Sequence, residues 1–148
     1  METLNTDRLD FLIKKTPDLL LQISEDAFSK KVSSKKWSKK EILGHLIDSA
    51  TNNHQRFVRA QFENTPSIPY NQDLWNKYSF YNSINSKQLI SFWKSYNNQI
   101  LALFNNMPKD SILKMCNTGG KDNYSLAFLF NDYIKHLEYH LNQIIDLK

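Results

Sequence analysis

Four long segments of this chain repeat apolar residues at the spacing of an amphipathic α-helix. They cover residues 4–28, 39–63, 86–105 and 126–146, and each places apolar side chains along one helical face. Only three glycines and four prolines occur in 148 residues, which argues against an all-β fold built on tight turns. The pattern therefore predicts an all-α fold: a single domain over residues 1–148 whose helices form a four-helix bundle.

Serine residues mark where two of these helices begin. Ser38 is followed three residues later by Glu41, the pattern of a capping box, in which each side chain bonds the backbone N–H of the other residue. Ser125 is placed to cap the last helix in the same way that Ser38 caps the second. In the first segment, Thr16 before Pro17 resembles a helix start, so that segment forms either two helices or one kinked helix.

The connections on either side of the third helix differ in character. Residues 66–85 carry five aromatic side chains without a helical period, so we expect a long connection with a short helix near 72–78 that walls a pocket. Within it, Trp75 and Tyr78 are expected to cover the core. Residues 108–124 predict a short extended piece and a turn.

The charge and hydropathy patterns give no reason to expect a nucleic acid or a membrane as a partner of this chain. The formal net charge is +4, and much of it comes from a run that contains Lys30, Lys31, Lys35, Lys36, Lys39 and Lys40. Because only Trp37 is interleaved as a stacking residue, we interpret the run as a solvated face and expect no nucleic-acid partner. No apolar run approaches the ~18 residues of a membrane span, so no membrane association is expected.

The single cysteine, Cys116, excludes an internal disulfide and fits a reducing compartment. Its role stays open. The first seven residues lack a basic stretch followed by an apolar one, so no signal peptide is predicted. We therefore expect a cytoplasmic protein.

Histidines on two predicted helices suggest a metal site. His136 and His140 are four residues apart, so their imidazoles share one helical face and can bind one transition-metal ion. Leu137 stands where the H-E-x-x-H metalloprotease motif has glutamate. His45, at the shoulder of the second helix's apolar stripe, is the candidate third ligand, whereas His54 lies about 180° around that helix and is excluded. Spacing alone leaves open that these are ordinary core histidines.

Three neutral imidazoles would leave at least one coordination position open for water or a thiol. Near them, Asp48 and Arg56 are the candidate catalytic residues, as a base or hydrogen-bond partner and as a carboxylate-binding group. Asn52 and Tyr133 are candidate pocket residues. The plainer alternatives are a surface carboxylate for Asp48, a surface ion pair for Arg56 and a core aromatic for Tyr133.

The residues around these histidines resemble a known family. The stretches WSKKEILGHLIDSA at 37–50 and NNHQRF at 52–57 look like the first signature of the DinB-like superfamily, and HLEYHLNQI at 136–144 resembles its second. YNQDLW at 70–75 is similar to the family's aromatic middle segment. The resemblance extends from about residue 37 to 146, and the superfamily includes bacillithiol transferases and mycothiol-dependent maleylpyruvate isomerases.

The resemblance implies that His45, His136 and His140 bind a divalent metal ion such as Zn, Ni or Mn. It also implies up-down-down-up connectivity, with a long crossover between helices two and three, and a homodimer. On this basis we predict an enzyme that transfers a low-molecular-weight thiol to an electrophilic small molecule. A metal-dependent hydrolase and a non-catalytic metal- or ligand-binding stress-response bundle are the alternatives. The second and fourth helices are expected to meet at Gly44.

Overall fold

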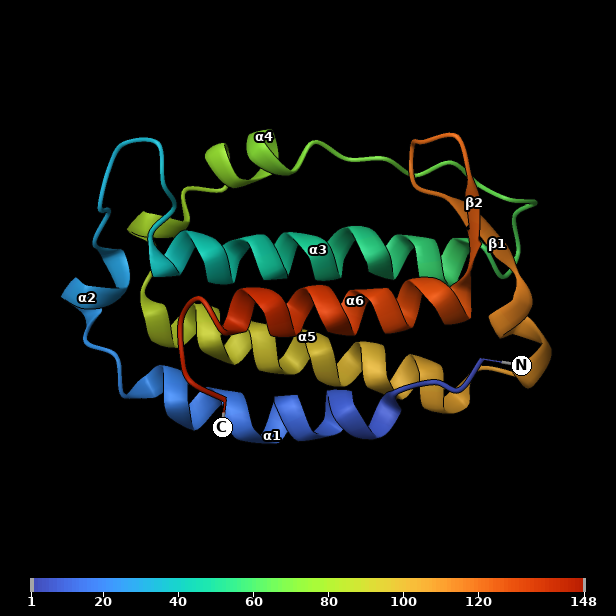
Figure 1. The fold of residues 1–148 in the computed structure, drawn as a ribbon, viewed down its shortest axis with the longest axis horizontal. Coiled ribbons are helices and arrows are strands. Elements are labelled where there is room, and N and C mark those ends of the chain that lie inside the picture. The colour runs from blue at the N-terminus through green and yellow to red at the C-terminus, as the bar shows by residue number, and fades with distance from the viewer. Residues whose placement is uncertain (1, 148) are drawn as a thin grey trace.

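A bundle of four long helices forms the body of the protein in the computed structural model, which describes residues 2–147 (Figure 1). This confirms the predicted all-α bundle. The helices are α1 (Thr6–Leu21), α2 (Glu25–Ser29), α3 (Lys39–Arg59), α4 (Gln72–Lys77), α5 (Ser86–Asn106) and α6 (Leu126–Leu141), with short 3₁₀ helices η1 (Tyr81–Ser83) and η2 (Lys109–Leu113). An antiparallel hairpin of β1 (Met115–Asn117) and β2 (Asn123–Ser125) precedes α6. Among residues 2–147, no helix has the length and apolar character needed to cross a membrane.

The direction of the helices determines the path of the chain. Figure 1 shows α1 and α6 running one way along the bundle and α3 and α5 running the other. In this bundle α3 packs against both α5 and α6, and α1 packs against the opposite sides of the same two helices. Because α3 and α5 run in the same direction, residues 60–85 return along the whole bundle before α5 begins, and this crossover carries α4 (Figure 1).

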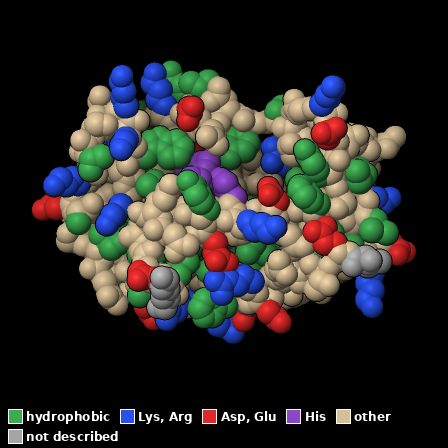
Figure 2. All heavy atoms as spheres, in the orientation of Figure 1, with side chains coloured by type: hydrophobic (Ala, Val, Ile, Leu, Met, Phe, Trp, Pro, Cys, Tyr) green, Lys and Arg blue, Asp and Glu red, His purple; other side chains and the backbone are tan. Residues whose placement is uncertain are grey.

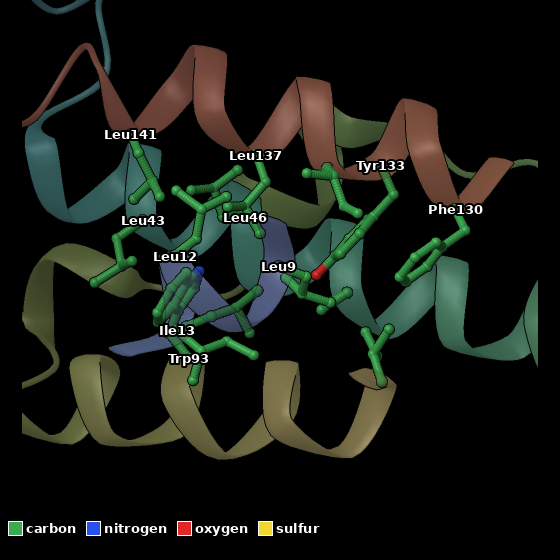
Figure 3. Packing of buried hydrophobic residues seen from close by; sticks show 14 of the residues in the cluster. Leu9, Leu12, Ile13, Leu43, Leu46, Trp93, Phe130, Tyr133, Leu137 and Leu141 are labelled. Atoms are coloured by element: carbon green, nitrogen blue, oxygen red, sulfur yellow. The ribbon is translucent and has the colours of Figure 1, made fainter. Parts of the chain in front are cut away.

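The core lies between the four long helices. Figure 3 shows apolar side chains from each of them meeting along the bundle axis. The buried set includes Leu9, Leu12, Leu43, Leu46, Trp93, Ile100, Phe130 and Leu137. Burial of these apolar faces is the main force that holds the helices together.

The predicted helix starts on α3 and α6 are present. Ser38 Oγ accepts from the Glu41 N–H at 3.1 Å, and the Ser38 N–H donates to Glu41 Oε1 at 2.9 Å. Ser125 Oγ accepts from the Phe128 N–H at 3.1 Å. These caps satisfy backbone N–H groups that have no partner within the first helical turn.

The break in the first helical segment lies elsewhere than Pro17. Pro17 is inside α1, because the buried face continues past it to Leu20 and a proline removes only one helical N–H donor. The segment does form two helices, but α2 starts at its own cap, where Ser24 Oγ accepts from the Ala27 N–H at 3.2 Å.

Two other helices end earlier than their apolar pattern predicts. The α-helix of α3 ends at Arg59, and residues 60–63 continue as turns; α6 ends at Leu141. Ile144 is buried without being helical, which shows that apolar spacing alone does not define a helix end.

The crossover is fastened to the bundle by polar contacts. The Asn76 side chain donates to the Glu41 carbonyl at 2.8 Å, and the Ile68 N–H donates to the Asn117 carbonyl at 2.9 Å. The expectation that Trp75 and Tyr78 cover the core is wrong, because their exposed fractions are 37% and 65%. Trp75 lies in α4 and Tyr78 is the C-cap residue of that helix, which lies outside α3 and contributes the buried Asn76 instead.

Lysines of the basic run are partly used inside the structure. Lys40 is buried and pairs with Glu25, and Lys31 Nζ lies 2.7 Å from Glu41 Oε1. These two ion pairs connect the loop and α2 to the start of α3.

Candidate metal centre

The structure brings the three predicted ligand histidines together where α3 packs against α6. The Nε2 atoms of His45 and His136 are 3.1 Å apart. One ring nitrogen from each of His45, His136 and His140 lies within 4.8 Å of the others. His45 is almost fully buried, whereas His136 and His140 are half-buried. Figure 2 shows histidine side chains reaching the surface of this face of the molecule.

Burial keeps the imidazoles of His45 and His136 neutral at pH 7. Burial lowers the pKa of His45 to about 3, and His136 and His140 lower it further. Burial, helped by His140, lowers the pKa of His136 to about 4, although Asp132 opposes the shift. A neutral imidazole offers the lone pair that a metal ion needs, so both residues are ready to act as ligands without first losing a proton.

Neighbouring side chains hold two of the histidines in place. Gln143 Oε1 accepts from His140 Nδ1 at 2.8 Å, which leaves Nε2 of that ring free for an ion. The Trp37 ring packs against His45 with 4.9 Å between ring centroids. His45 Nδ1 is buried without a hydrogen-bond partner. Three imidazoles, one of them oriented by an amide oxygen, fit a divalent transition metal with an open coordination position.

Asp48 lies one turn beyond His45 but does not bond it. Its Oδ1 accepts from the Tyr81 hydroxyl, while Oδ2 is buried without a hydrogen-bond partner. Burial raises the pKa of Asp48 to about 6, although the Tyr81 hydrogen bond acts in the opposite direction. The carboxyl therefore faces the crossover.

Gly44 also faces the crossover and not α6. A Cβ on Gly44 would overlap the ring of Tyr81. The expectation that this glycine lets α3 and α6 approach each other is therefore wrong. Its lack of a side chain admits Tyr81, which then reaches Asp48.

A cavity of about 470 Å³ extends from the histidine cluster between α3 and α6. Its lining residues come from α3, α6, the crossover and the hairpin: Ser49, Asn53, Arg56, Tyr70, Thr118, Tyr124, Phe128, Leu129, Asp132, Tyr133 and His136. Arg56 and Asp132 are its two charged lining residues. The cavity therefore places polar groups and an aromatic wall next to one of the three candidate ligands.

The other predicted site residues occupy different positions. Tyr133 lines the cavity, and its buried hydroxyl donates to Asn97 Oδ1 at 2.6 Å. Asn52 is buried on α3, and its amide donates to the Asp48 carbonyl at 2.9 Å; it is not among the cavity's lining residues.

Two residues stand apart from the centre. His54 Nδ1 lies 3.0 Å from the Tyr96 hydroxyl, on another face of α3. Cys116 is buried on β1, 3.4 Å from the Pro66 carbonyl oxygen. Neither belongs to the histidine cluster found among the described residues.

A second cavity of about 630 Å³ reaches the cluster at a different histidine. It is lined by Lys35, Lys36, Trp37, Ile42, Asp73, His140 and Gln143, and it shares no lining residue with the first. His136 thus lines one cavity and His140 lines the other.

Sequence reasoning missed several residues of the site. Asp132 could have been predicted from the sequence, because it lies four residues before His136 and therefore on the same face of the helix. Tyr70 and Tyr81 carry no such signal, since both lie in an irregular segment whose path follows from tertiary contacts.

Two solved structures have the same fold. YfiT from Bacillus subtilis, described as a probable metal-dependent hydrolase with an unusual four-helix bundle topology, superimposes with a TM-score of 0.81 at 19% sequence identity. The match covers 94% of this chain and 83% of YfiT. A mutant of a mycothiol-dependent maleylpyruvate isomerase matches with a TM-score of 0.73 at 12% identity, over 92% of this chain and 58% of the isomerase.

The sequence itself gives no further match. No protein-family model and no curated protein matches it. At these identities the two structures show the fold alone, and that fold is the four-helix bundle that the sequence resemblance implies. The chain therefore has the four-helix bundle of YfiT, with three histidines gathered between α3 and α6.

Proposed function

We propose that this protein is a divalent-metal-dependent enzyme that transfers a low-molecular-weight thiol to an electrophilic small molecule. His45, His136 and His140 are its metal ligands in this proposal. The observation that carries it is the pair of separate cavities, one lined by His136 and the other by His140. A transfer between two small molecules needs room for both beside one reactive centre, whereas hydrolysis needs room for one and for water.

When bound by these imidazoles, a divalent ion supplies a Lewis acid that lowers the pKa of a thiol or water at its open position. In the transfer, the thiol sulfur forms a bond to the electrophilic carbon while the leaving group departs with its electron pair. The proton of the thiol leaves with the leaving group or passes to solvent.

The chain's own residues bind and orient the reactants. Phe128, Leu129 and Tyr133 give the first cavity an apolar wall, against which the organic part of a substrate can pack. Trp37 fixes the position of His45, and Gln143 fixes the orientation of His140. The site is therefore organised before a substrate arrives.

Hydrolysis is the second candidate, and one observation favours it. Asp132 lines the first cavity together with His136, so a carboxylate is available to accept a proton from an attacking water. Asp48, the base considered from the sequence, bonds Tyr81 and is not a lining residue of that cavity.

An assay with and without thiol separates the two candidates. Zinc-loaded protein is incubated with a chlorinated nitrobenzene and either cysteine or glutathione, and the thioether product is measured against the uncatalysed rate. A nitrophenyl ester without thiol tests hydrolysis. Thioether formation that requires both thiol and metal supports transfer; ester cleavage without thiol, in the absence of transfer, would overturn it in favour of hydrolysis.

The proposal includes two further properties of the protein. A homodimer is expected from the family resemblance, and light scattering of the purified protein measures it directly. Cytoplasmic location is expected from the sequence, and fractionation of cells that express the chain checks it.

A further inference from the structure

Arg56 is a buried positive charge without an acidic partner. Its exposed fraction is 7%. Its Nε and Nη2 donate to the carbonyl oxygen of Ile68 at 2.9 and 2.7 Å, and its Nη1 donates to Asn53 Oδ1 at 3.2 Å. Both acceptors are uncharged. Among the ion pairs of residues 2–147, none involves Arg56.

The other two arginines of the chain show what is missing. Arg8 pairs with Glu138 and Arg59 pairs with Glu63, each at 2.6 Å and each near the surface. A buried charge needs compensation more than an exposed one, because burial removes it from water. Arg56 is the most buried of the three and yet lacks the partner that the others have.

The guanidinium of Arg56 is held rigidly at the wall of the first cavity. Three of its five N–H donors are used by Ile68 and Asn53, so two remain. Asn53 is itself oriented, since its amide nitrogen donates to the Ser49 carbonyl at 2.9 Å. The Tyr70 ring lies beside the guanidinium, with Arg56 Cζ 5.8 Å from the ring centroid.

Arg56 and the metal centre are at opposite ends of this cavity. Arg56 follows His45 by eleven residues on α3, which is about 16 Å along the helix axis. His136, at the near end, and Arg56, at the far end, both line the cavity. Between them lie Phe128, Leu129 and the ring of Tyr133.

We infer that the first cavity binds a small carboxylic acid, with its carboxylate on Arg56, its apolar middle against Phe128 and Leu129, and its reactive end at the metal centre. A planar carboxylate matches the remaining N–H groups of a guanidinium, because both are flat and the hydrogen bonds are charge-assisted. This assignment rests on the proposed function for the reactive end, and it names the class of electrophile that the site selects.

Asp132 is the competing charge in the cavity, and its position limits its effect. It is exposed and lies one turn from His136 on α6, so it faces the metal end. Its influence is felt at His136, whose pKa it raises. The far end of the cavity therefore keeps the positive charge of Arg56.

The test is a binding measurement with a matched pair of probes. Phenylbutyrate carries the carboxylate and phenylbutyramide is its uncharged counterpart. Calorimetry with the zinc-loaded, full-length protein is expected to show the acid binding roughly tenfold to a hundredfold more tightly than the amide. Equal affinity for the two would overturn the inference.

Variants assign that preference to Arg56. Arg56→Gln is expected to abolish the preference for the acid and leave the affinity for the amide unchanged, and Arg56→Lys to retain part of it. Arg59→Gln is the matched control, because it removes a surface arginine of the same helix and should change neither affinity. If Arg56→Gln weakens acid and amide equally, Arg56 has a structural role and the inference fails.

Two further measurements test the inference even if a variant does not fold or if no metal ion binds. In the unmodified protein, the Nη–H resonances of Arg56, which include the two unused donors, should shift with phenylbutyrate and not with phenylbutyramide; no shift with the acid would contradict the inference even if Arg56→Gln does not fold. His45→Ala removes a metal ligand that does not line the cavity. Preference for the acid should persist there, so failure of the metal proposal and failure of the carboxylate site give different results.

Discussion

The Nε2 atoms of His45 and His136 lie 3.1 Å apart although 91 positions separate these residues in the chain. One comes from α3 and the other from α6, and His140 joins them from the next turn of α6. Two neutral imidazoles that face each other through the same type of nitrogen can share one hydrogen bond at most. A metal ion between them would use both lone pairs at once. The geometry of this pair is the centre of the functional proposal.

Replacing Gln143 should weaken metal binding without affecting the fold. In Gln143→Ala, His140 loses the acceptor of its Nδ1–H bond, and loss of such a partner typically costs tenfold to a hundredfold, roughly, in metal affinity. Competition with a zinc-binding dye measures the change. Gln99→Ala, an exposed position on α5, serves as the control. An unchanged affinity in Gln143→Ala would show that this bond does not orient the ligand.

Gly44→Ala should destabilise the protein, although alanine favours a helix more than glycine does. The new methyl group would overlap the ring of Tyr81, and overpacking of this kind costs about 1–3 kcal/mol. Urea unfolding measures the free energy of unfolding. In Gly120→Ala the added Cβ meets nothing within 4 Å, so that variant should stay within about 0.5 kcal/mol of the parent. Equal stability of both variants would mean that Tyr81 does not occupy this place.

Asp48→Asn should stabilise the protein at neutral pH and much less in acid. The folded-state pKa of Asp48 is about 6, above its ordinary value of 3.8, mainly because the carboxyl is buried. Below pH 3.8 the Asp48 carboxyl is protonated in both the folded and the unfolded state, so its burial costs no stability. As the pH rises through 6, the folded state must hold a buried negative charge, and the free energy of unfolding of the parent protein falls. A shift of this size corresponds to roughly 2–3 kcal/mol.

The measurement is the difference in unfolding free energy between Asp48→Asn and the parent at pH 4 and at pH 7. This difference should grow in favour of the variant as the pH rises. Asn can still accept from Tyr81, so the hydrogen bond is kept in both proteins. A difference that does not change with pH would show that Asp48 titrates normally.

Chelation should lower the melting temperature of the protein. An ion present at a thousand times its dissociation constant stabilises the folded state by about 4 kcal/mol, which corresponds to roughly 8–16 °C for a chain of this size. Calorimetry with and without a chelator measures the shift. In His136→Ala the chelator should have no effect, and an equal shift in that variant would place the stabilising ion elsewhere.

The gathering of His45, His136 and His140 could be predicted because helical spacing fixes which side chains share a face. His136 and His140 are one turn apart, and the apolar stripes require α3 and α6 to pack through the faces that carry His45 and His136. The same geometry separates His54, which the structure places against Tyr96. Regular periodicity therefore predicts both the helical fold and the gathering of the three histidines.

What the crossover contributes could not be predicted. The aromatic residues of the crossover, residues 60–85, do not repeat at helical or strand spacing. Nothing in the sequence therefore indicates that Tyr81 meets Gly44 and Asp48. One partner of Arg56 is the backbone carbonyl of Ile68, and the pattern of side chains in a sequence carries no information about which carbonyl a residue will meet. Helix ends were misplaced for a related reason: apolar spacing continues into turns, as it does at Ile144.

Metal stoichiometry tests the central claim most directly. Plasma mass spectrometry of the purified full-length protein should find one divalent metal ion per chain. His136→Ala should lose it, while His54→Ala, which changes a histidine of α3 outside the cluster, should keep it. A parent protein that binds no ion when zinc, nickel or manganese is supplied, or an ion that remains in His136→Ala at full occupancy, would contradict the assignment of His45, His136 and His140 as a metal centre.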